Sequence, residues 1–323
     1  MSSAKYLMTK PKLARYPLGS SGTLVTPLGL GGAWLGRTPE CIDEELAIAT
    51  VLRALDLGIN LIDTSAGYLG GSRSERIIGE ALERWYELGG RRGDVVISTK
   101  TGTRDRQNRD FSASGTRQSV EESLELLRTD YLDVVLVHDP RELDPVLAPD
   151  GAWAELKRMK AEGLIRMIGL GVRTHEFHRR LIETGECDVV LTHSDFHLLD
   201  QSAGKDVLDP AAARGVGVFL GSPLGQGLLS GRDPREVLKE RPRLAAHSPD
   251  FEARVEKAYE LWTWCKAWGV DLLALNLQFC VRDPRVDVTL VGAATPGQIE
   301  RDVQALSAEI PAAMWEELPA KIR

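Results

Sequence analysis

Four side chains suited to proton transfer stand where buried strands are expected to end. Asp63 follows Asn-Leu-Ile, Lys100 follows Val-Val-Ile-Ser-Thr, His138 follows Val-Val-Leu-Val, and Tyr68 comes five residues after Asp63. A phenol with a pKa near ~10 is a poor acid or base at neutral pH. An adjacent ammonium lowers that pKa, a carboxylate keeps the ammonium charged, and a neutral imidazole can hold a substrate oxygen. Together these groups could move the proton that accompanies hydride transfer between C–OH and C=O.

Each of these residues also has an ordinary structural interpretation. Lys100 could be a solvated lysine at a strand end, and His138 a satisfied polar residue at the rim. Asp63 could cap a helix, and Tyr68 could pack within a loop. Their occurrence on three successive predicted strands favours the catalytic interpretation, because adjacent strand ends lie within side-chain reach of one another.

The elements that must position these residues alternate along the chain. Short runs rich in Val, Ile and Leu are typical of parallel strands buried on both faces. Such strands are predicted at 26–30, 60–63, 95–99, 132–137, 165–169, 189–192, 217–220 and 288–291. Helical periodicity follows at 42–57, 74–88, 119–127, 152–162, 174–184, 210–214, 251–268 and 296–306.

Eight successive β–α pairs allow either a long doubly wound sheet or a closed barrel. Residues 15–27 resemble a β-hairpin cap rather than the first strand of a dinucleotide-binding sheet. The residues with chemical character also stand at the C-terminal ends of several strands, which form the mouth of a barrel. We therefore predict an α/β fold, a single (β/α)8 TIM barrel with an N-terminal β-hairpin cap. One domain over residues 1–323 would carry both catalysis and cofactor binding.

Composition excludes several classes of partner. The 323 residues include 40 Lys+Arg and 47 Asp+Glu, a formal net charge of −7. This acidic balance, without a long basic run, argues against nucleic acid or a membrane as partner, and no apolar run approaches the ~20 residues of a membrane span. The cysteines, which indicate neither a disulfide framework nor a metal site, are Cys41, Cys187, Cys265 and Cys280. We expect a reduced, cytoplasmic protein that acts on a small molecule as a monomer or weak homo-oligomer.

The segment GINLIDTSAGYLGGSRSERIIGEAL resembles the signature of the aldo-keto reductase family, in which a Tyr follows an Asp by five residues. The segments ISTKTG and LVHDP are similar to the lysine and histidine segments of that family. The resemblance implies a (β/α)8 barrel that binds NAD(P)(H) without a Rossmann domain. By position, Tyr68 would be the proton donor or acceptor, His138 would orient the carbonyl, and Asp63 and Lys100 would tune the tyrosine.

Glycine-rich segments follow the seventh and eighth predicted strands, where barrels often bind phosphate. They resemble the family's pyrophosphate-covering loop and adenosine-phosphate segment, although either could be a connection without a ligand. The expected cofactor contacts are Gly32, His193, Ser222, Leu224, Gly225, Gln226, Gly227, Gly292, Ala293, Thr295, Gln298, Arg301 and Asp302.

Departures from the family pattern bear on the choice of cofactor. The basic residues that hold the 2′-phosphate in many NADP-preferring members are replaced here by Gly292 or Ala293 and by Gln298. Loss of these cations favours NAD, whereas Arg301 could still reach the 2′-phosphate of NADP. His193 stands where the family has a glutamine that contacts nicotinamide.

A narrower resemblance concerns the substrate. VEESLELLRTDYLDVVLVHDP and DVVLTHSDFHLLDQSA are similar to the NAD-linked aldose 1-dehydrogenases and to the L-fucose, L-galactose and pyridoxal dehydrogenases. This implies oxidation of a sugar hemiacetal at C1 to a lactone, with Tyr68 as general acid/base. Substrate contacts are expected from Trp34, Tyr68 and His138, although Trp34 could equally pack the barrel mouth.

The loop 101–116 contains several arginines, among them Arg104, Arg106 and Arg109. It could close over the site, bind an anionic substituent or be a solvated loop.

Two other functions also stay open. One is an NADPH-dependent reductase of aldehydes or ketones, and the other is a nucleotide-binding barrel subunit without catalysis.

Overall fold

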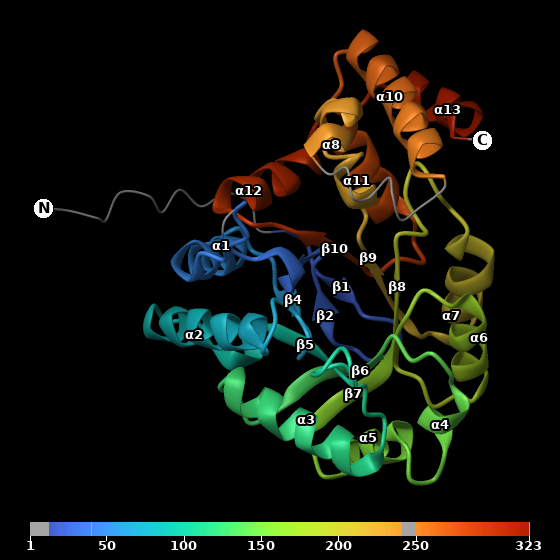
Figure 1. Cartoon of the computed structure of the whole chain (residues 1–323). Helices are drawn as coiled ribbons and strands as arrows, with labels where there is room; N and C mark the ends of the chain where they lie inside the picture. Colours follow the sequence, from blue (N-terminus) through green and yellow to red (C-terminus); the bar gives the residue numbers. More distant parts are fainter. Residues whose placement is uncertain (1–12, 40, 241–249, 323) are drawn as a thin grey trace, which may run out of the picture.

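Parallel strands form a closed barrel at the centre of the molecule (Figure 1). The computed structural model describes residues 13–39, 41–240 and 250–322. Around the barrel the strands run in the order β10-β3-β4-β5-β6-β7-β8-β9. Their bounds are β3 (Leu28–Gly31), β4 (Leu61–Asp63), β5 (Val96–Thr101), β6 (Leu132–His138), β7 (Ile165–Gly171), β8 (Val189–His193), β9 (Gly217–Gly221) and β10 (Val288–Gly292). The predicted (β/α)8 barrel is therefore confirmed.

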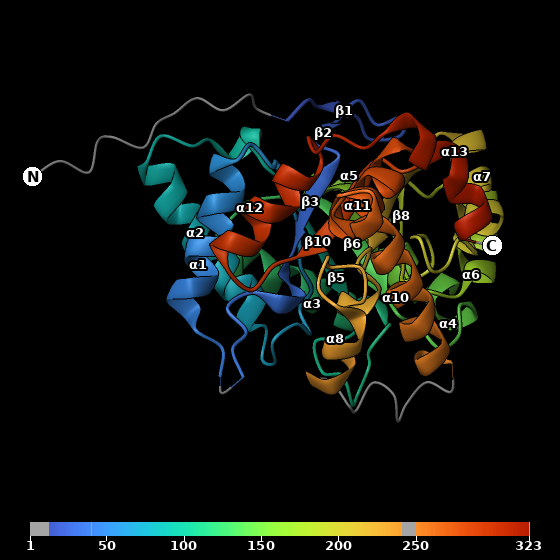
Figure 2. The ribbon, with the colours of Figure 1, turned by 90° about the horizontal axis from the view of Figure 1, so that it is seen from above.

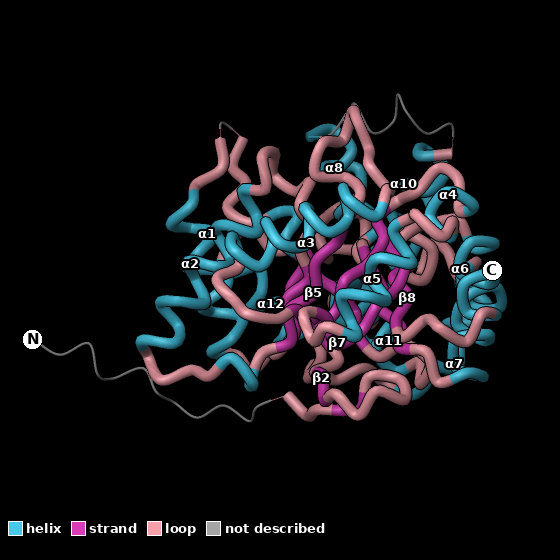
Figure 3. The backbone as a smooth tube through the Cα atoms, turned by 90° about the horizontal axis from the view of Figure 1, so that it is seen from below, coloured by secondary structure: helices cyan, strands magenta, loops and turns pink. Residues whose placement is uncertain are grey.

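A layer of helices covers the outside of the barrel, and Figure 3 shows the strands enclosed within it. The described helices are α1 (Glu44–Asp56), α2 (Arg73–Glu87), α3 (Ala113–Leu126), α4 (Asp144–Leu147), α5 (Ala152–Ala161), α6 (His175–Glu183), α7 (Asp209–Arg214), α8 (Pro234–Glu240), α10 (Phe251–Ala267), α11 (Leu272–Arg282), α12 (Pro296–Ala305) and α13 (Ala312–Lys321). Within the described ranges, no helix is both long and apolar enough to span a membrane.

Side-chain caps fix where several of these helices begin. Asp43 accepts a hydrogen bond from the backbone N–H of Leu46 at the start of α1, and Thr295 does the same for Gln298 at the start of α12. Ser112 caps α3 by accepting from the N–H of Gly115. This helix begins at Ala113, six residues before the predicted helix at 119–127, so the preceding loop is shorter than the sequence indicated.

The chain between β9 and β10 departs from a simple β–α pair. Its described part contains α8, α10 and α11, whereas a single helix at 251–268 was predicted. The sequence of α11 has little polar periodicity because almost all of it is buried, so no amphipathic pattern marks it.

The predicted N-terminal hairpin closes one end of the barrel. β1 (Tyr16–Pro17) pairs with β2 (Leu24–Val25) in antiparallel fashion. Leu18 and Val25 are fully buried and belong to the apolar cluster that fills the barrel interior. Figure 2 places this hairpin and α8 at opposite ends of the molecule. The C-terminal strand ends therefore form the open end.

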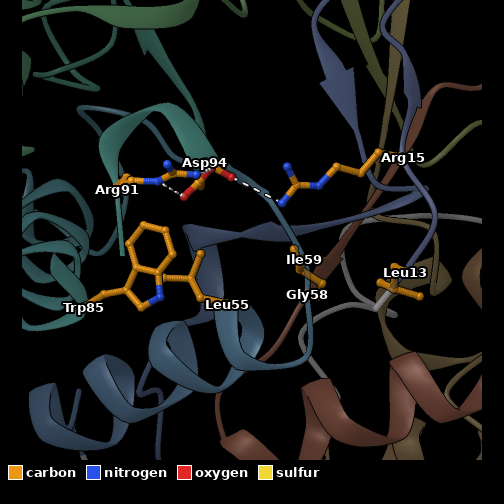
Figure 4. Close-up of a pocket in the computed structure, with 8 residues that line it drawn as sticks. All are labelled: Leu13, Arg15, Leu55, Gly58, Ile59, Trp85, Arg91 and Asp94. Atoms are coloured by element: carbon orange, nitrogen blue, oxygen red, sulfur yellow. Dashed lines mark hydrogen bonds and ion pairs between the residues drawn. The ribbon is translucent and has the colours of Figure 1, made fainter. Parts of the chain in front are cut away.

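A pocket of about 350 Å³ lies outside the barrel on the hairpin side (Figure 4). Trp85, Leu55 and Ile59 form part of its wall. Asp94 pairs with Arg91 and accepts a hydrogen bond from Arg15 at its backbone carbonyl. The arginines are thus held by Asp94, and the predicted catalytic residues lie elsewhere.

Candidate active site

The alternation of side chains along each strand places these polar residues inside the barrel. Successive side chains of a strand alternate between its two faces, and the interior cluster includes Leu61 on β4, Val96 on β5 and Leu136 on β6. Asp63 and His138 stand two residues after Leu61 and Leu136, and Lys100 stands four after Val96. They therefore share the interior face at the open end.

Lys100 is held in a buried ion pair with Asp63. Its Nζ lies 2.5 Å from Oδ2 of Asp63 and donates to the carbonyl oxygen of Thr64 at 2.7 Å. The Ser98 hydroxyl donates to the other oxygen of Asp63 at 2.8 Å. Burial raises the pKa of Asp63, although Lys100 opposes that rise. Burial alone would lower the pKa of Lys100, but the charges of Asp63 and Tyr68 raise it above its usual value, so the amine stays an ammonium.

Tyr68 lies against this pair. The Nζ of Lys100 is 4.9 Å from the centre of the Tyr68 ring. Burial raises the pKa of Tyr68, the positive charge of Lys100 lowers it, and the balance is above the usual value. The expected lowering by Lys100 therefore exists, but desolvation outweighs it in this site. Tyr68 is a neutral phenol at neutral pH.

His138 faces Tyr68 edge-on, with ring centres 5.6 Å apart and ring planes at 81°. Its Nδ1 lies 2.5 Å from the hydroxyl oxygen of Thr103 and 3.1 Å from that of Ser65. Burial and the charge of Lys100 lower the pKa of His138 to about 3. The imidazole is therefore neutral across the physiological range, as the sequence predicted for a group that holds a substrate oxygen.

Asp139 links His138 to a second histidine. It has a positive φ of 46°, and its carboxylate oxygens lie 3.7 Å from Nε2 of His138 and 3.7 Å from Nε2 of His193. Burial raises the pKa of Asp139, but a hydrogen bond from His193 and neighbouring positive charge, including that of Arg109, hold it below its usual value. Arg109 donates to the backbone carbonyl of Asp139. The carboxylate is thus ionised between two imidazoles.

A cavity of about 1100 Å³ extends from these residues to α12. Trp34, Tyr68 and His138, the predicted substrate contacts, all line it. So do most of the predicted cofactor residues, namely His193, Ser222, Leu224, Gln226, Gly227, Gly292, Gln298, Arg301 and Asp302. A cavity of this volume, lined by residues from the strand ends to α12, can take a large ligand.

The other predicted cofactor residues do not line this cavity. Gly32 and Ala293 are buried, and so is Gly225 in the turn after β9. Thr295 is used to cap α12. Cofactor contacts from these four residues remain predictions.

The chain matches the model of the aldo/keto reductase family over residues 27–323. This stretch contains Asp63, Tyr68, Lys100 and His138, the four predicted catalytic residues. The chain belongs to the aldo/keto reductase family. Among aldo/keto reductases and related proteins, it is 34% identical over 307 residues to an L-galactose dehydrogenase of Arabidopsis thaliana, covering 93% of this chain and 89% of that protein.

Two further comparisons agree with this family. A D-threo-aldose 1-dehydrogenase of Pseudomonas sp is 28% identical, with 93% of this chain and 94% of that protein covered. The solved structure of a glycerol dehydrogenase from Gluconobacter oxydans superposes with a TM-score of 0.77 at 24% identity, covering 95% of this chain and 94% of that one. The last similarity concerns the fold alone. The predicted resemblance to the family and to its aldose dehydrogenases is confirmed, and this aldo/keto reductase is an oxidoreductase.

The family uses nicotinamide cofactors, and the cavity walls fit such a group. Gly292 forms part of the wall where a Cβ would lie 2.8 Å from Cδ1 of Trp34, so a side chain there would push the indole away. Ser222 and Gln226, two exposed residues of the turn after β9 that line the cavity, adopt positive φ values of 52° and 62°. We expect these two wall segments to hold the nucleotide when it is bound.

Several supporting residues were not found from the sequence. Ser98 fixes Asp63, and Ser65 and Thr103 contact Nδ1 of His138. In the sequence, Asp139 stands out only as part of the LVHDP segment. Each stands on or just after a strand that carries a catalytic candidate, so a hydroxyl or carboxyl near a strand end is the signal that could have identified them.

Proposed function

We propose that this protein is an NAD-dependent aldose 1-dehydrogenase that oxidises the anomeric C–OH of a sugar hemiacetal to a lactone. Asp63, Tyr68, Lys100 and His138 would be its catalytic residues. The observation that carries the proposal is the position of the Lys100 ammonium, 2.5 Å from Asp63 and 4.9 Å from the Tyr68 ring. The similarity to dehydrogenases of L-galactose and of a D-threo-aldose supports a sugar substrate.

Tyr68 removes the proton in this proposal. The oxygen of the Tyr68 phenolate takes the hydroxyl proton as the C–H bond at the same carbon breaks. Lys100 stabilises the phenolate, and Asp63 keeps the ammonium in place. Bound NAD supplies the acceptor for the hydride that leaves this carbon.

His138 holds the reacting oxygen. The Ser65 hydroxyl already accepts a hydrogen bond from the N–H of Gly67, so its own hydrogen is available to Nδ1 of His138. A neutral imidazole that accepts at Nδ1 carries its proton on Nε2. We assign this tautomer, which donates from Nε2 to the substrate oxygen beside Tyr68.

The choice of NAD rests on the side chains of α12 and its neighbours. Gln298 accepts a hydrogen bond from the N–H of Ala294 and carries no charge. Arg301 lies 3.7 Å from the carboxylate of Asp271 and donates to the carbonyl of Ser230. Burial raises the pKa of Asp302 to about 7, so part of this carboxyl is ionised at neutral pH and would repel a 2′-phosphate.

The reverse reaction is the second candidate. Because the pKa of Tyr68 is above its usual value, the residue is protonated at neutral pH and suits donation of a proton to a carbonyl oxygen. The same four residues would then reduce an aldehyde or ketone with NADH or NADPH.

A matrix of substrates and cofactors tests the proposal. Aldoses, pyridoxal and simple aldehydes are each assayed with both oxidised and both reduced cofactors, and the absorbance of reduced nicotinamide is followed. We expect the highest kcat/KM for an aldose with NAD. Higher values for aldehyde reduction with NADPH would replace this proposal by the second candidate.

The pH dependence of the two directions should differ. Oxidation needs the Tyr68 phenolate, whose pKa lies above its usual value, so kcat/KM for oxidation should rise with pH throughout the range from 6 to about 10. Reduction needs the phenol and should stay flat over the same range. His138, with a pKa of about 3, should add no step near its ordinary value. An oxidation profile that levels off near pH 7 would contradict the assigned role of Tyr68.

A further inference from the structure

The wall of the catalytic cavity carries guanidinium groups that hydride transfer does not require. Arg37, Arg106 and Arg109 line the same cavity as Tyr68 and His138. Arg37 comes from the loop after β3, and the other two come from the loop between β5 and α3. Two loops that are separate in the sequence therefore bring positive charge to one cavity.

Arg106 lies beside the residue that precedes Tyr68. Its Nε lies 3.4 Å from the position that a Cβ on Gly67, the residue before Tyr68, would take. Its charge also reaches His138: after burial and Lys100, it is among the groups that lower the pKa of that imidazole. A guanidinium at this point is within reach of a substrate that contacts both Tyr68 and His138.

The neighbouring arginines already have partners, whereas Arg106 has none among the described residues. Arg104 pairs with Glu122 at 2.9 Å and lies 3.5 Å from Glu75. Arg109 donates to the carbonyl of Asp139. Across the parts of the chain that the structure describes, no hydrogen bond or ion pair engages the Arg106 guanidinium.

The carboxylates nearest to the reaction are not available to neutralise it. Asp63 is bound to Lys100, and Asp139 lies between two histidines. Arg37 lies over the Trp34 ring, with its Cζ 5.0 Å from the ring centre, and no described carboxylate pairs with it. A guanidinium that lies beside an aromatic ring and has no counter-ion is suited to bind an anionic ligand with an apolar face.

We propose that the substrate is an anionic aldose, which carries a carboxylate or a phosphate ester at the end remote from its anomeric carbon. Arg106 binds this anionic group through its planar guanidinium, and Arg37 adds a second positive charge beside the Trp34 platform. The inference rests on the proposed function, because the anomeric hydroxyl must lie between Tyr68 and His138.

The test compares sugars of one configuration that differ only at C6. Hexoses, the matching hexuronic acids and the matching hexose 6-phosphates are assayed with NAD over several configurations. We expect a kcat/KM about 10- to 100-fold higher for one charged series than for the neutral hexose. Preference for the uronic acid assigns a carboxylate ligand, and preference for the 6-phosphate assigns a phosphate ester.

Arg106→Gln locates the effect. A group remote from the reacting carbon contributes to binding in the ground state and the transition state alike, so the variant should raise KM for the charged sugar about 10- to 100-fold with little change in kcat. KM for the neutral hexose should change much less. Arg214→Gln, an exposed arginine at the end of α7, is the matched control and should leave both values unchanged.

The outcomes separate the two proposals. Equal or better kcat/KM for neutral hexoses would overturn the anionic substrate and leave the dehydrogenase standing. Absence of turnover with every sugar would overturn the dehydrogenase, and titration of the protein with glucuronate and with glucose 6-phosphate, followed by tryptophan fluorescence, then decides the anion site. Saturable binding that Arg106→Gln weakens supports the site, and equal binding by both proteins, or no binding by either, overturns it.

Discussion

Tyr68→Phe should lower kcat/KM by about 10²- to 10⁴-fold while leaving the affinity for the nucleotide nearly unchanged. The variant removes one oxygen atom from a side chain that contacts Lys100 and His138 through its ring, and the ring remains. Proton transfer then has no acceptor, whereas the cavity between Ser222 and Asp302 is untouched. Steady-state kinetics and fluorescence titration with NADH measure the two quantities.

Tyr16→Phe is the matched control for this variant. Tyr16 lies on the N-terminal hairpin and is 57% exposed, so loss of its hydroxyl should change neither quantity. Retained turnover in Tyr68→Phe would show that another group moves the proton. A parallel loss of NADH binding would show that the hydroxyl supports the cavity instead.

Lys100→Met should damage both catalysis and stability. The ammonium that lowers the pKa of Tyr68 is lost, so kcat/KM for oxidation should fall by about 10²- to 10⁴-fold. Asp63, only 3% exposed, is left without its ammonium partner. Breaking one side of a buried ion pair typically costs about 3–5 kcal/mol in the free energy of unfolding. Urea denaturation and initial rates measure the two effects.

A second substitution separates the two effects of Lys100→Met. Adding Asp63→Asn removes the buried carboxylate, so the double variant should recover much of the lost stability. Activity should stay low, because no ammonium stabilises the Tyr68 phenolate. Lys205→Met, at an exposed lysine, controls for the loss of a positive charge. Recovery of activity in the double variant would contradict the assigned role of Lys100.

The strands could be predicted from the sequence because each is buried on both faces and is short and apolar. The hairpin could be predicted from its turn residues, and Leu18 and Val25 explain why it closes the barrel. α11 escaped prediction for the opposite reason: it is buried so fully that its sequence shows no polar face. Periodicity reports a helix only where one side meets water.

The candidate site, like the fold, could be predicted from the sequence only in part. Asp63, Lys100 and His138 could be predicted to converge because strand ends meet at one rim, and the register of β4, β5 and β6 places them on the interior face. The net rise in the pKa of Tyr68 could not be predicted from the sequence, because it depends on how much water the folded site excludes. The free guanidinium of Arg106 could not be told from that of Arg104, since ion-pair partners such as Glu122 come from other elements.

The pairing of β4 with β5 and of β5 with β6 has a consequence for how the enzyme fails. Asp63 is level with Ser98, and Lys100 is level with Leu136, so Asp63, Lys100 and His138 come together only when β4, β5 and β6 are paired. The cavity is also lined by His193, Ser222 and Gly292, which stand at the ends of β8, β9 and β10, so turnover should need the closed barrel. In a denaturant series, loss of turnover should superimpose on loss of the circular dichroism signal, and a half-open barrel should be inactive.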